Sequence, residues 1–250
     1  MAGILVGLIV FLFGLCVGSF VNVVVYRLNH SLSPLRGRSF CPKCKKKIPW
    51  QDNLPLLSFI LLRGRCRFCH SPISWQYPLV ELATGLATVF VLYSVSNYLL
   101  AIYYLVITYA LIALFVSDFR YQTIPDEIVY PMILISLLYT ISYTPYAILA
   151  ALGASLFFLA LVLVTRGRGM GMGDVKLAGL MGLVLGFPEI VVALMLAFLT
   201  GAIVGVILVS IGKKHFREHI PFGPFLTSAT WISLFWGQTI WQFYLEKFLF

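Results

Sequence analysis

Residues 1–26 read MAGILVGLIVFLFGLCVGSFVNVVVY and contain no Asp, Glu, Lys or Arg. A helix that crosses the hydrocarbon core of a bilayer needs about 20 predominantly apolar residues, so this stretch is long enough to span a membrane. Its apolar run exceeds the about 7–15 residues of a signal-peptide hydrophobic region, and no basic region precedes it. We therefore expect it to persist as a first transmembrane helix.

Four further runs of the chain also lack charged side chains: residues 82–117, 128–165, 190–212 and 220–245. Of the 250 residues, 60% are hydrophobic and 11% are charged, whereas soluble domains carry about 25% charged residues. Five such runs are more than a soluble core of this size can bury. The sequence therefore predicts an all-α polytopic membrane protein.

The positive charges are concentrated directly after the first run. Residues 27–77 hold ten of the 18 Lys and Arg side chains, and basic loops of membrane proteins tend to stay on the cytoplasmic side. We therefore expect a cytoplasmic insert, an N-terminus on the opposite side, and contact of the basic side chains with anionic lipid headgroups. The net charge of +9 does not predict nucleic-acid binding, because no nucleic-acid-binding module accompanies it.

This orientation predicts about eight transmembrane helices in the inner membrane. The connections between paired helices are expected near 94–97, 142–145 and 187–189, with cytoplasmic returns at 118–120, 166–176 and 213–218. The arrangement leaves only Lys247 among the Lys and Arg residues outside the cytoplasm. The predicted modules are the first helix (1–26), the insert (27–77) and a helical membrane body (78–250), without an internal repeat.

Residues 177–188 form an unusually short sixth span. Their twelve residues would cover roughly 18 Å as a helix, against a hydrocarbon thickness of about 30 Å. Either the bilayer is thinner here, or the chain enters the membrane before the helix begins. The second arrangement would bury the preceding Gly-rich loop, and irregular backbone at that depth is tolerated only beside protein or water.

Two C-x2-C pairs, Cys41–Cys44 and Cys66–Cys69, lie in the insert. Four thiolates satisfy the tetrahedral preference of Zn²⁺, and an insert of about 50 residues needs such a staple because its own apolar core is small. Disulfides and free thiols are the alternatives. Disulfides are disfavoured in a reducing cytoplasm, so the pattern favours structural zinc.

Asp118 and Asp174 both fall at expected cytoplasmic ends of membrane spans. Ionisable side chains in a membrane protein are costly and indicate function, and two neighbouring carboxyls that share one proton can activate water and polarise an amide. Both aspartates also have possible structural roles. Asp174 could be the N-cap of a helix that begins at Val175, and Asp118 could form a surface contact with Arg120. From position alone, catalysis, a structural role and ion coupling in a transporter all stay open.

Four neighbouring residues and one more distant carboxylate complete the candidate site. Gly171 and Gly173 lack a Cβ and would allow a substrate backbone to approach Asp174 closely. Lys176 either neutralises Asp174 or faces headgroups, and Asp126 suits the first turn of the next helix. Glu81, near the start of the second span, either extends to the interface or lines the site.

These residues together resemble the type 4 prepilin peptidase family, whose members are membrane aspartyl proteases of the GxGD type. The motifs that carry the resemblance are Gly18-Ser-Phe-Val-Asn-Val-Val-Val-Tyr-Arg27, Asn53-Leu-Pro-Leu-Leu-Ser58, Leu62-Arg-Gly-Arg-Cys66, Tyr77-Pro-Leu-Val-Glu81, Ile124-Pro-Asp126, Gly171-Met-Gly-Asp-Val-Lys176 and Phe222-Gly-Pro-Phe225. They occur together with the four cysteines and Asp118, and they extend over nearly the whole chain.

The resemblance implies cleavage of the basic leader from type IV prepilins or type II secretion pseudopilins on the cytoplasmic side, with Asp118 and Asp174 as the catalytic pair. Many members that have the cysteine insert also N-methylate the new amino terminus with S-adenosylmethionine, so we expect a bifunctional enzyme. No residues are assigned to the methyl donor. The competing hypotheses are a polytopic cation transporter with a cytoplasmic metal-binding loop and a noncatalytic zinc-stapled scaffold.

Overall fold

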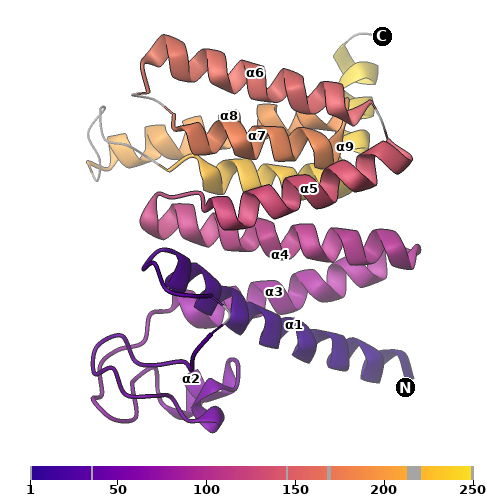
Figure 1. The fold of residues 1–250 in the computed structure, drawn as a ribbon. Helices are drawn as coiled ribbons and strands as arrows, with labels where there is room; N and C mark the ends of the chain where they lie inside the picture. The colour runs from indigo at the N-terminus through magenta and orange to yellow at the C-terminus, as the bar shows by residue number, and fades with distance from the viewer. Residues whose placement is uncertain (1, 35, 145, 168–169, 213–220, 249–250) are drawn as a thin grey trace. The chain divides into compact units, whose positions relative to one another are not determined.

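In a computed structural model, the chain is described over residues 2–34, 36–144, 146–167, 170–212 and 221–248. Within these residues lie nine α-helices and one 3-10 helix: α1 (Ala2–Leu28), η1 (Trp50–Asn53), α2 (Leu57–Leu61), α3 (Gln76–Ser94), α4 (Tyr98–Tyr121), α5 (Asp126–Tyr143), α6 (Ala147–Thr165), α7 (Met172–Leu185), α8 (Glu189–Ser210) and α9 (Gly223–Phe248) (Figure 1). Five of them, α1, α3, α4, α6 and α8, are long and apolar enough to cross a membrane. The predicted all-α membrane protein is confirmed.

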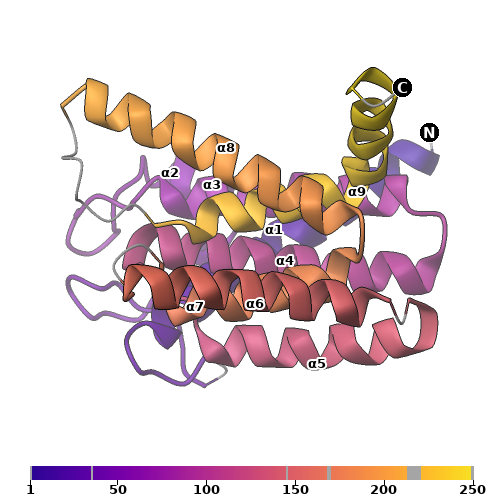
Figure 2. The same cartoon turned by 90° about the horizontal axis from the view of Figure 1, so that it is seen from above.

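The helix boundaries agree with the expected connections. The gaps between α3 and α4, α5 and α6, and α7 and α8 lie where the sequence predicts turns. Membrane crossing by α5, α7 and α9, and hence the number of eight spans, stays a prediction. The C-terminal part of α9 turns away from the direction of its N-terminal part (Figure 2). The expected return at 213–218 lies outside the described residues.

The short segment after the Gly-rich loop is helical from Met172 onward. α7 contains 14 residues and is therefore about 21 Å long. The helix thus begins five residues before the expected Leu177 and includes Gly173 and Asp174. These two residues lie in regular helix rather than in an irregular loop.

The chain divides into two compact units, residues 1–113 and 114–250, with the boundary inside α4. The first unit contains α1, the cysteine insert and α3, and the second contains both aspartates. The predicted module boundaries after residues 26 and 77 stay predictions.

In the first unit, α1 packs against α3 through glycines. A Cβ on Gly14 would lie 2.8 Å from the Cα of Gly85, and a Cβ on Gly18 would lie 2.8 Å from the Cα of Glu81. Glycines four residues apart share a helix face, and small residues allow membrane helices to approach closely. The glycine at the start of the N-terminal motif therefore serves helix packing.

In the second unit, α6 packs against α7 in the same way (Figures 1 and 2). A Cβ on Gly182 would overlap the Cα of Ala151, and one on Gly179 would lie 2.7 Å from the Ser155 hydroxyl oxygen. The buried side chains of Leu177, Met181 and others around them form the core that α5, α6, α8 and α9 cover. Gly179 and Gly182 therefore fix the position of α7, the helix that carries Asp174.

Candidate functional site

Asp118 lies in the last turn of α4 with 7% of its surface exposed. The backbone N–H of Gly223, the first residue of α9, donates a hydrogen bond of 2.8 Å to Asp118 Oδ2. A Cβ at Gly223 would lie 2.6 Å from the same oxygen, so only glycine allows this approach. The Phe222–Phe225 motif is thus connected to Asp118, a contact that sequence reasoning missed because 105 residues separate the partners.

Asp174 is the third residue of α7 and is also 7% exposed. The Gly171 N–H donates to Asp174 Oδ2 at 3.0 Å, and the Asp174 N–H donates to the Gly171 carbonyl at 3.1 Å. Gly171 is the N-cap, so the expected N-cap at Asp174 is wrong: the helix begins three residues earlier. The carboxylate lies at the positive end of the helix dipole, which favours negative charge.

The two aspartates therefore have matching environments within one compact unit. Each carboxylate is buried and accepts a backbone N–H at the N-terminus of a helix, α9 for Asp118 and α7 for Asp174. α7 and α9 pack against each other. Two buried carboxylates that each accept a backbone amide at a helix N-terminus are suited to holding and transferring a proton.

Lys176 forms an ion pair with Asp126, a partner that was not predicted for it from the sequence. Its Nζ lies 2.6 Å from Asp126 Oδ1 and 2.9 Å from Oδ2, and 5.2 Å from the ring centroid of Tyr130. Asp126 is the first residue of α5, which confirms the expected first-turn position. The pair joins α5 to α7 two residues after Asp174.

Ile124, in the Ile-Pro-Asp motif, contacts the other side of this turn. A Cβ on Gly173 would lie 3.1 Å from Ile124 Cβ, whereas a Cβ on Gly171 would meet no heavy atom closer than 3.9 Å. Gly173 is therefore needed for packing within the protein. Position 171 has more space around it, and the approach of a substrate there stays a prediction.

Glu81 belongs to the first unit, and its carboxylate is buried against the insert rather than extended toward solvent. Its exposed fraction is 8%, and Oε2 accepts a 2.8 Å hydrogen bond from the backbone N–H of Leu56 in the insert. The carboxylate thus fixes the insert to α3. Its predicted part in lining the site stays a prediction.

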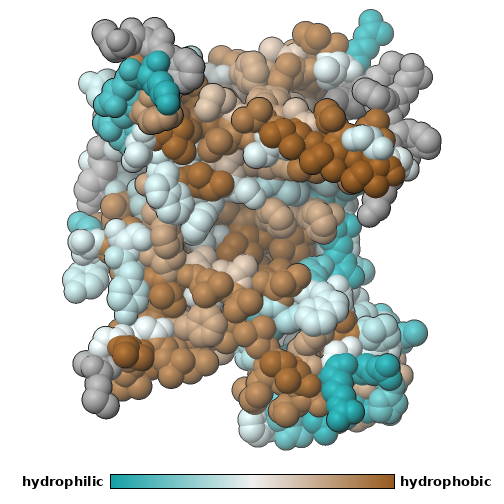
Figure 3. Space-filling model, turned by 180° about the vertical axis from the view of Figure 1, so that it is seen from behind, coloured by the Kyte–Doolittle hydropathy of each residue, from teal (hydrophilic) through white to brown (hydrophobic). Residues whose placement is uncertain are grey.

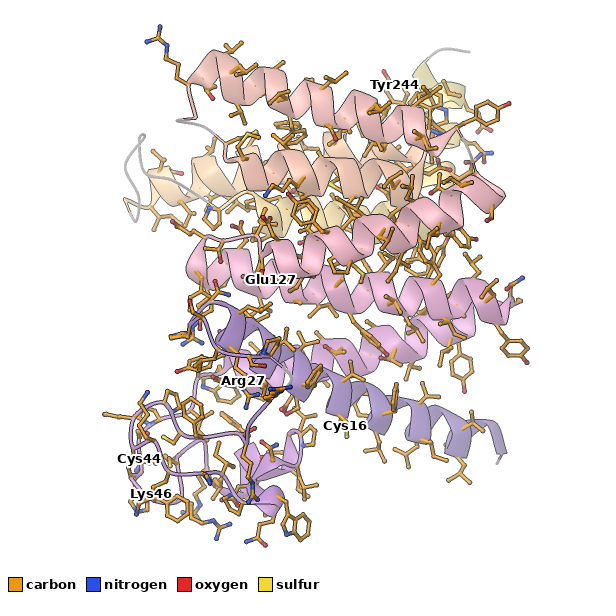
Figure 4. The ribbon with its side chains drawn as sticks, in the orientation of Figure 1. Cys16, Arg27, Cys44, Lys46, Glu127 and Tyr244 are labelled. Atoms are coloured by element: carbon orange, nitrogen blue, oxygen red, sulfur yellow. The ribbon has the colours of Figure 1, made fainter. Side chains whose placement is uncertain are left out.

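Arg27, the last residue of the N-terminal motif, is a second anchor of the insert. Its guanidinium is buried and donates to backbone carbonyls of the loop that follows α1, including those of Arg36 at 2.8 Å and Arg38 at 3.2 Å. Figure 4 shows Arg27 at the end of α1 next to the insert, which carries Cys44. An arginine in a juxtamembrane loop is usually assigned to headgroups, so its structural role was not predicted.

The four insert cysteines converge. Their Sγ atoms all lie within 4.8 Å of one another, and the Cys41 and Cys69 sulfurs are 3.8 Å apart. Four sulfurs arranged as a tetrahedron around Zn²⁺ at about 2.3 Å would be about 3.8 Å apart. All five cysteines of the chain are described and free. The cluster can therefore hold a metal ion, and its sulfur donors fit zinc.

The two cysteine pairs have the same backbone fold, so the expectation of no internal repeat is wrong. Cys41 accepts from the N–H of Lys45, as Cys66 accepts from the N–H of His70, and both donor residues have positive φ. Each pair is closed by an antiparallel bridge. The shared pattern C-x2-C-x3-Ile-x-Trp, at 41–50 and 66–75, is the signal that reveals the repeat.

Ser71 is a further member of the cluster. Its hydroxyl is 3.1 Å from Cys69 Sγ, and hydrogen bonds from the Ser71 side chain and backbone lower the pKa of Cys69 to about 6. A thiolate is the metal-binding form of cysteine. Ser71 therefore prepares Cys69 to bind a cation at neutral pH.

The amino-acid sequence of the chain is similar to those of a known protein family. Residues 12–95 match the model of the bacterial peptidase A24 N-terminal domain, and residues 105–206 match that of the type IV leader peptidase family. The prepilin leader peptidase/N-methyltransferase of Aeromonas hydrophila is 36% identical over 96% of this chain and 94% of its own length. The proteins of the same name from Pseudomonas aeruginosa (34%, over 94% and 92%) and Burkholderia pseudomallei (34%, over 93% and 85%) are similar along most of their length. No solved structure has significant similarity to the chain.

The fold and the comparisons together define a helical membrane enzyme with buried carboxylates and a four-cysteine insert that can hold a metal ion. The chain belongs to the type IV leader peptidase family. Membership in a peptidase family favours the protease hypothesis over the cation transporter and the noncatalytic scaffold.

Proposed function

We propose that the chain removes the leader from prepilins or pseudopilins, with Asp118 and Asp174 as its catalytic pair. The observation that carries this proposal is the shared environment of the two carboxylates, each buried and held by the amide at a helix N-terminus within one unit. The names of the relatives, prepilin leader peptidases, support the substrate class.

The proposed reaction needs one proton shared between the two carboxyls. The ionised carboxylate takes a proton from water as the water oxygen attacks the scissile carbonyl carbon, and the protonated carboxyl donates its proton to the carbonyl oxygen. The tetrahedral intermediate then breaks its C–N bond, and a proton passes to the leaving nitrogen. The products are the carboxyl end of the leader and a free amino terminus.

The Lys176–Asp126 ion pair has a positioning role in this proposal. It pairs the ammonium of Lys176, two residues after Asp174, with the Asp126 carboxylate. It also joins α5 to the first turns of α7. Both carboxylate oxygens of Asp126 contact Lys176.

We further propose that the chain methylates the new amino terminus, as the relatives' names include N-methyltransferase. Bound S-adenosylmethionine would supply the methyl group: the deprotonated amine nitrogen would form the new N–C bond as the sulfonium S–CH3 bond breaks, and S-adenosylhomocysteine would leave. Zn²⁺ bound by Cys41, Cys44, Cys66 and Cys69 would hold the insert in shape. The proposed location is the inner membrane, with the insert and both aspartates on the cytoplasmic side, where leaders are found.

The test is incubation of the purified full chain with a prepilin, with and without S-adenosylmethionine, followed by intact-mass analysis. We expect leader loss in both reactions and a further 14 Da, the mass of one methylene group, only with the methyl donor. Asp118→Asn and Asp174→Asn should each abolish cleavage because an amide cannot share or accept the proton.

Asp52→Asn is the matched control, since it makes the same chemical change in the insert and should leave cleavage intact. Circular dichroism and zinc content should be unchanged in all three variants. Cleavage at the wild-type rate by either Asp118→Asn or Asp174→Asn would refute the catalytic assignment.

A further inference from the structure

The cysteine insert exposes an unusual number of large apolar side chains around its short helix α2. The set comprises Trp50, Leu57, Ile60, Leu61 and Trp75, which are 74%, 50%, 69%, 71% and 70% exposed. We call this set the α2 face. Phe59 packs against Trp75, with their ring centroids 4.9 Å apart, so one of the exposed indoles is held in place. Exposing this much apolar surface to water is unfavourable, and such patches usually mark a surface that contacts a partner or a membrane.

The α2 face begins beside the first turns of α3, a helix long and apolar enough to cross a membrane. Leu56, the residue before α2, donates its N–H to Glu81. Glu81 is the sixth residue of α3, one of the helices that can cross a membrane. Five residues of rise put Glu81 about 7.5 Å into that helix. α2 therefore begins beside the second turn of a membrane span, which is the level of the bilayer interface.

A second contact holds the insert at the same level. The Asn22 side chain of α1 donates to the carbonyl of Tyr77, at the start of α3, at 3.2 Å. The ends of α1 and α3 are therefore tied together where the insert leaves them. Figure 1 shows α2 alongside the C-terminal half of α1 rather than beyond its end.

The charge around the α2 face is strongly positive. Residues 29–75 contain nine Lys and Arg and a single acidic residue, Asp52, which Arg67 binds at 2.5 and 2.7 Å. Figure 3 shows hydrophobic and hydrophilic surfaces side by side on the insert. Figure 4 shows Lys46, beside Cys44, on the outer side of the insert.

We propose that the α2 face is an interfacial membrane anchor that buries its apolar side chains in a bilayer surface containing anionic lipid. Tryptophan favours the membrane–water interface, and an apolar face bordered by Lys and Arg is typical of elements that lie in the interface plane. The basic residues complement anionic headgroups. The two C-x2-C turns, each ending in one of the anchor tryptophans, are thereby held against the membrane.

The probe is tryptophan fluorescence of the full chain in vesicles of phosphatidylcholine and phosphatidylglycerol. Trp231, Trp236 and Trp241 are replaced by Phe, leaving Trp50 and Trp75. We expect strong quenching by phosphatidylcholine brominated near the headgroup, weaker quenching by lipid brominated near the chain end, and little quenching by aqueous acrylamide. Removing phosphatidylglycerol should weaken the lipid quenching and increase acrylamide access.

A second experiment avoids the replacement of Trp231, Trp236 and Trp241, in case that variant does not fold. Wild-type protein is compared with Trp50→Phe/Trp75→Phe, and the difference in brominated-lipid quenching reports the two anchor residues. No difference, or free access of acrylamide to both indoles, would overturn the proposal. It would also fail if shielding required added prepilin, which indicates a substrate surface, or rose with protein-to-lipid ratio, which indicates a second copy of the chain.

Discussion

The four-cysteine insert and the aspartate site hold their functional side chains in opposite ways. Each cysteine turn closes within about ten residues, through bonds such as His70 N–H to the Cys66 carbonyl and Ile73 N–H to the Gly64 carbonyl. Asp118, by contrast, is held by an amide 105 residues away. The comparison shows that a ligand set built from local turns is readable in sequence, whereas a site assembled from helix ends depends on how the helices pack.

The largest expected effect is loss of the metal from the insert. Cys66→Ser should lower bound zinc from about one ion per chain to near zero, since structural zinc contributes about 10–16 kcal/mol in isolated zinc-finger peptides. Limited proteolysis should then cut within residues 29–75. Leader cleavage should fall by less than about tenfold, or 1.4 kcal/mol, because Gly171 and Gly223 still hold the aspartates.

Cys16→Ser is the control for this experiment, because Cys16 lies on α1 outside the cluster. Elemental analysis should find its zinc unchanged. Full zinc retention by Cys66→Ser would show that Cys66 is not needed to bind the metal. A complete loss of leader cleavage, as expected for Asp118→Asn, would show that the aspartate site depends on the insert.

The next effect concerns the long-range contact of the aspartate site. Gly223→Ala places a Cβ against Asp118 Oδ2, and a displacement of about 1 Å in a catalytic group can cost about 10²-fold in rate. We expect this loss in kcat/KM for leader cleavage, with normal zinc content. Gly153→Ala, whose Cβ would meet no atom within 4 Å, should cleave at the wild-type rate.

Wild-type cleavage by Gly223→Ala would show that the amide of Gly223 does not set the position of Asp118. The site would then have to be held mainly by α4 itself.

A smaller effect is expected from the packing that places α7. Gly182→Ala would force apart the backbones of α6 and α7 at Ala151, and overpacking a tight core costs about 1–3 kcal/mol. Thermal unfolding in detergent should show a lower midpoint than for wild type, while Gly153→Ala should not. An unchanged unfolding midpoint for Gly182→Ala would mean that α6 and α7 can move apart at this contact with little loss of stability.

The smallest effect is expected at the ion pair of the insert. The hydrogen bonds from Arg67 lower the pKa of Asp52 below its ordinary value of 3.8, so its stabilising contribution is fully present above pH 3.8 and is lost only as the pH falls through the lowered pKa. Asp52→Asn should therefore release zinc to a chelator slightly faster than wild type, by the same factor from pH 6 to 8. A factor that changes across this range would contradict the assigned charge state.

The sequence predicts most of the fold because membrane helices need long uncharged runs. The turns near 94–97 and 187–189 agree with the helix ends for this reason. The start of α7 was misplaced because its first turn is glycine-rich and polar, and the Gly171–Asp174 hydrogen bonds stabilise it despite poor helix propensity. The partner of Lys176 could not be chosen from the sequence, because Asp126 lies 50 residues away and only the packing of α5 against α7 brings it into reach.

By itself, the sequence determined the membrane class, the two cysteine turns and the identity of the two buried aspartates as candidates, because apolar run length and local spacing are properties of neighbouring residues. Only the tertiary structure decided that Gly223 holds Asp118, that Asp126 takes Lys176, and that Glu81 fixes the insert. Those contacts join residues 25 to 105 positions apart. They depend on which helix faces pack together, and in this chain backbone contact at glycines and small side chains decides that packing.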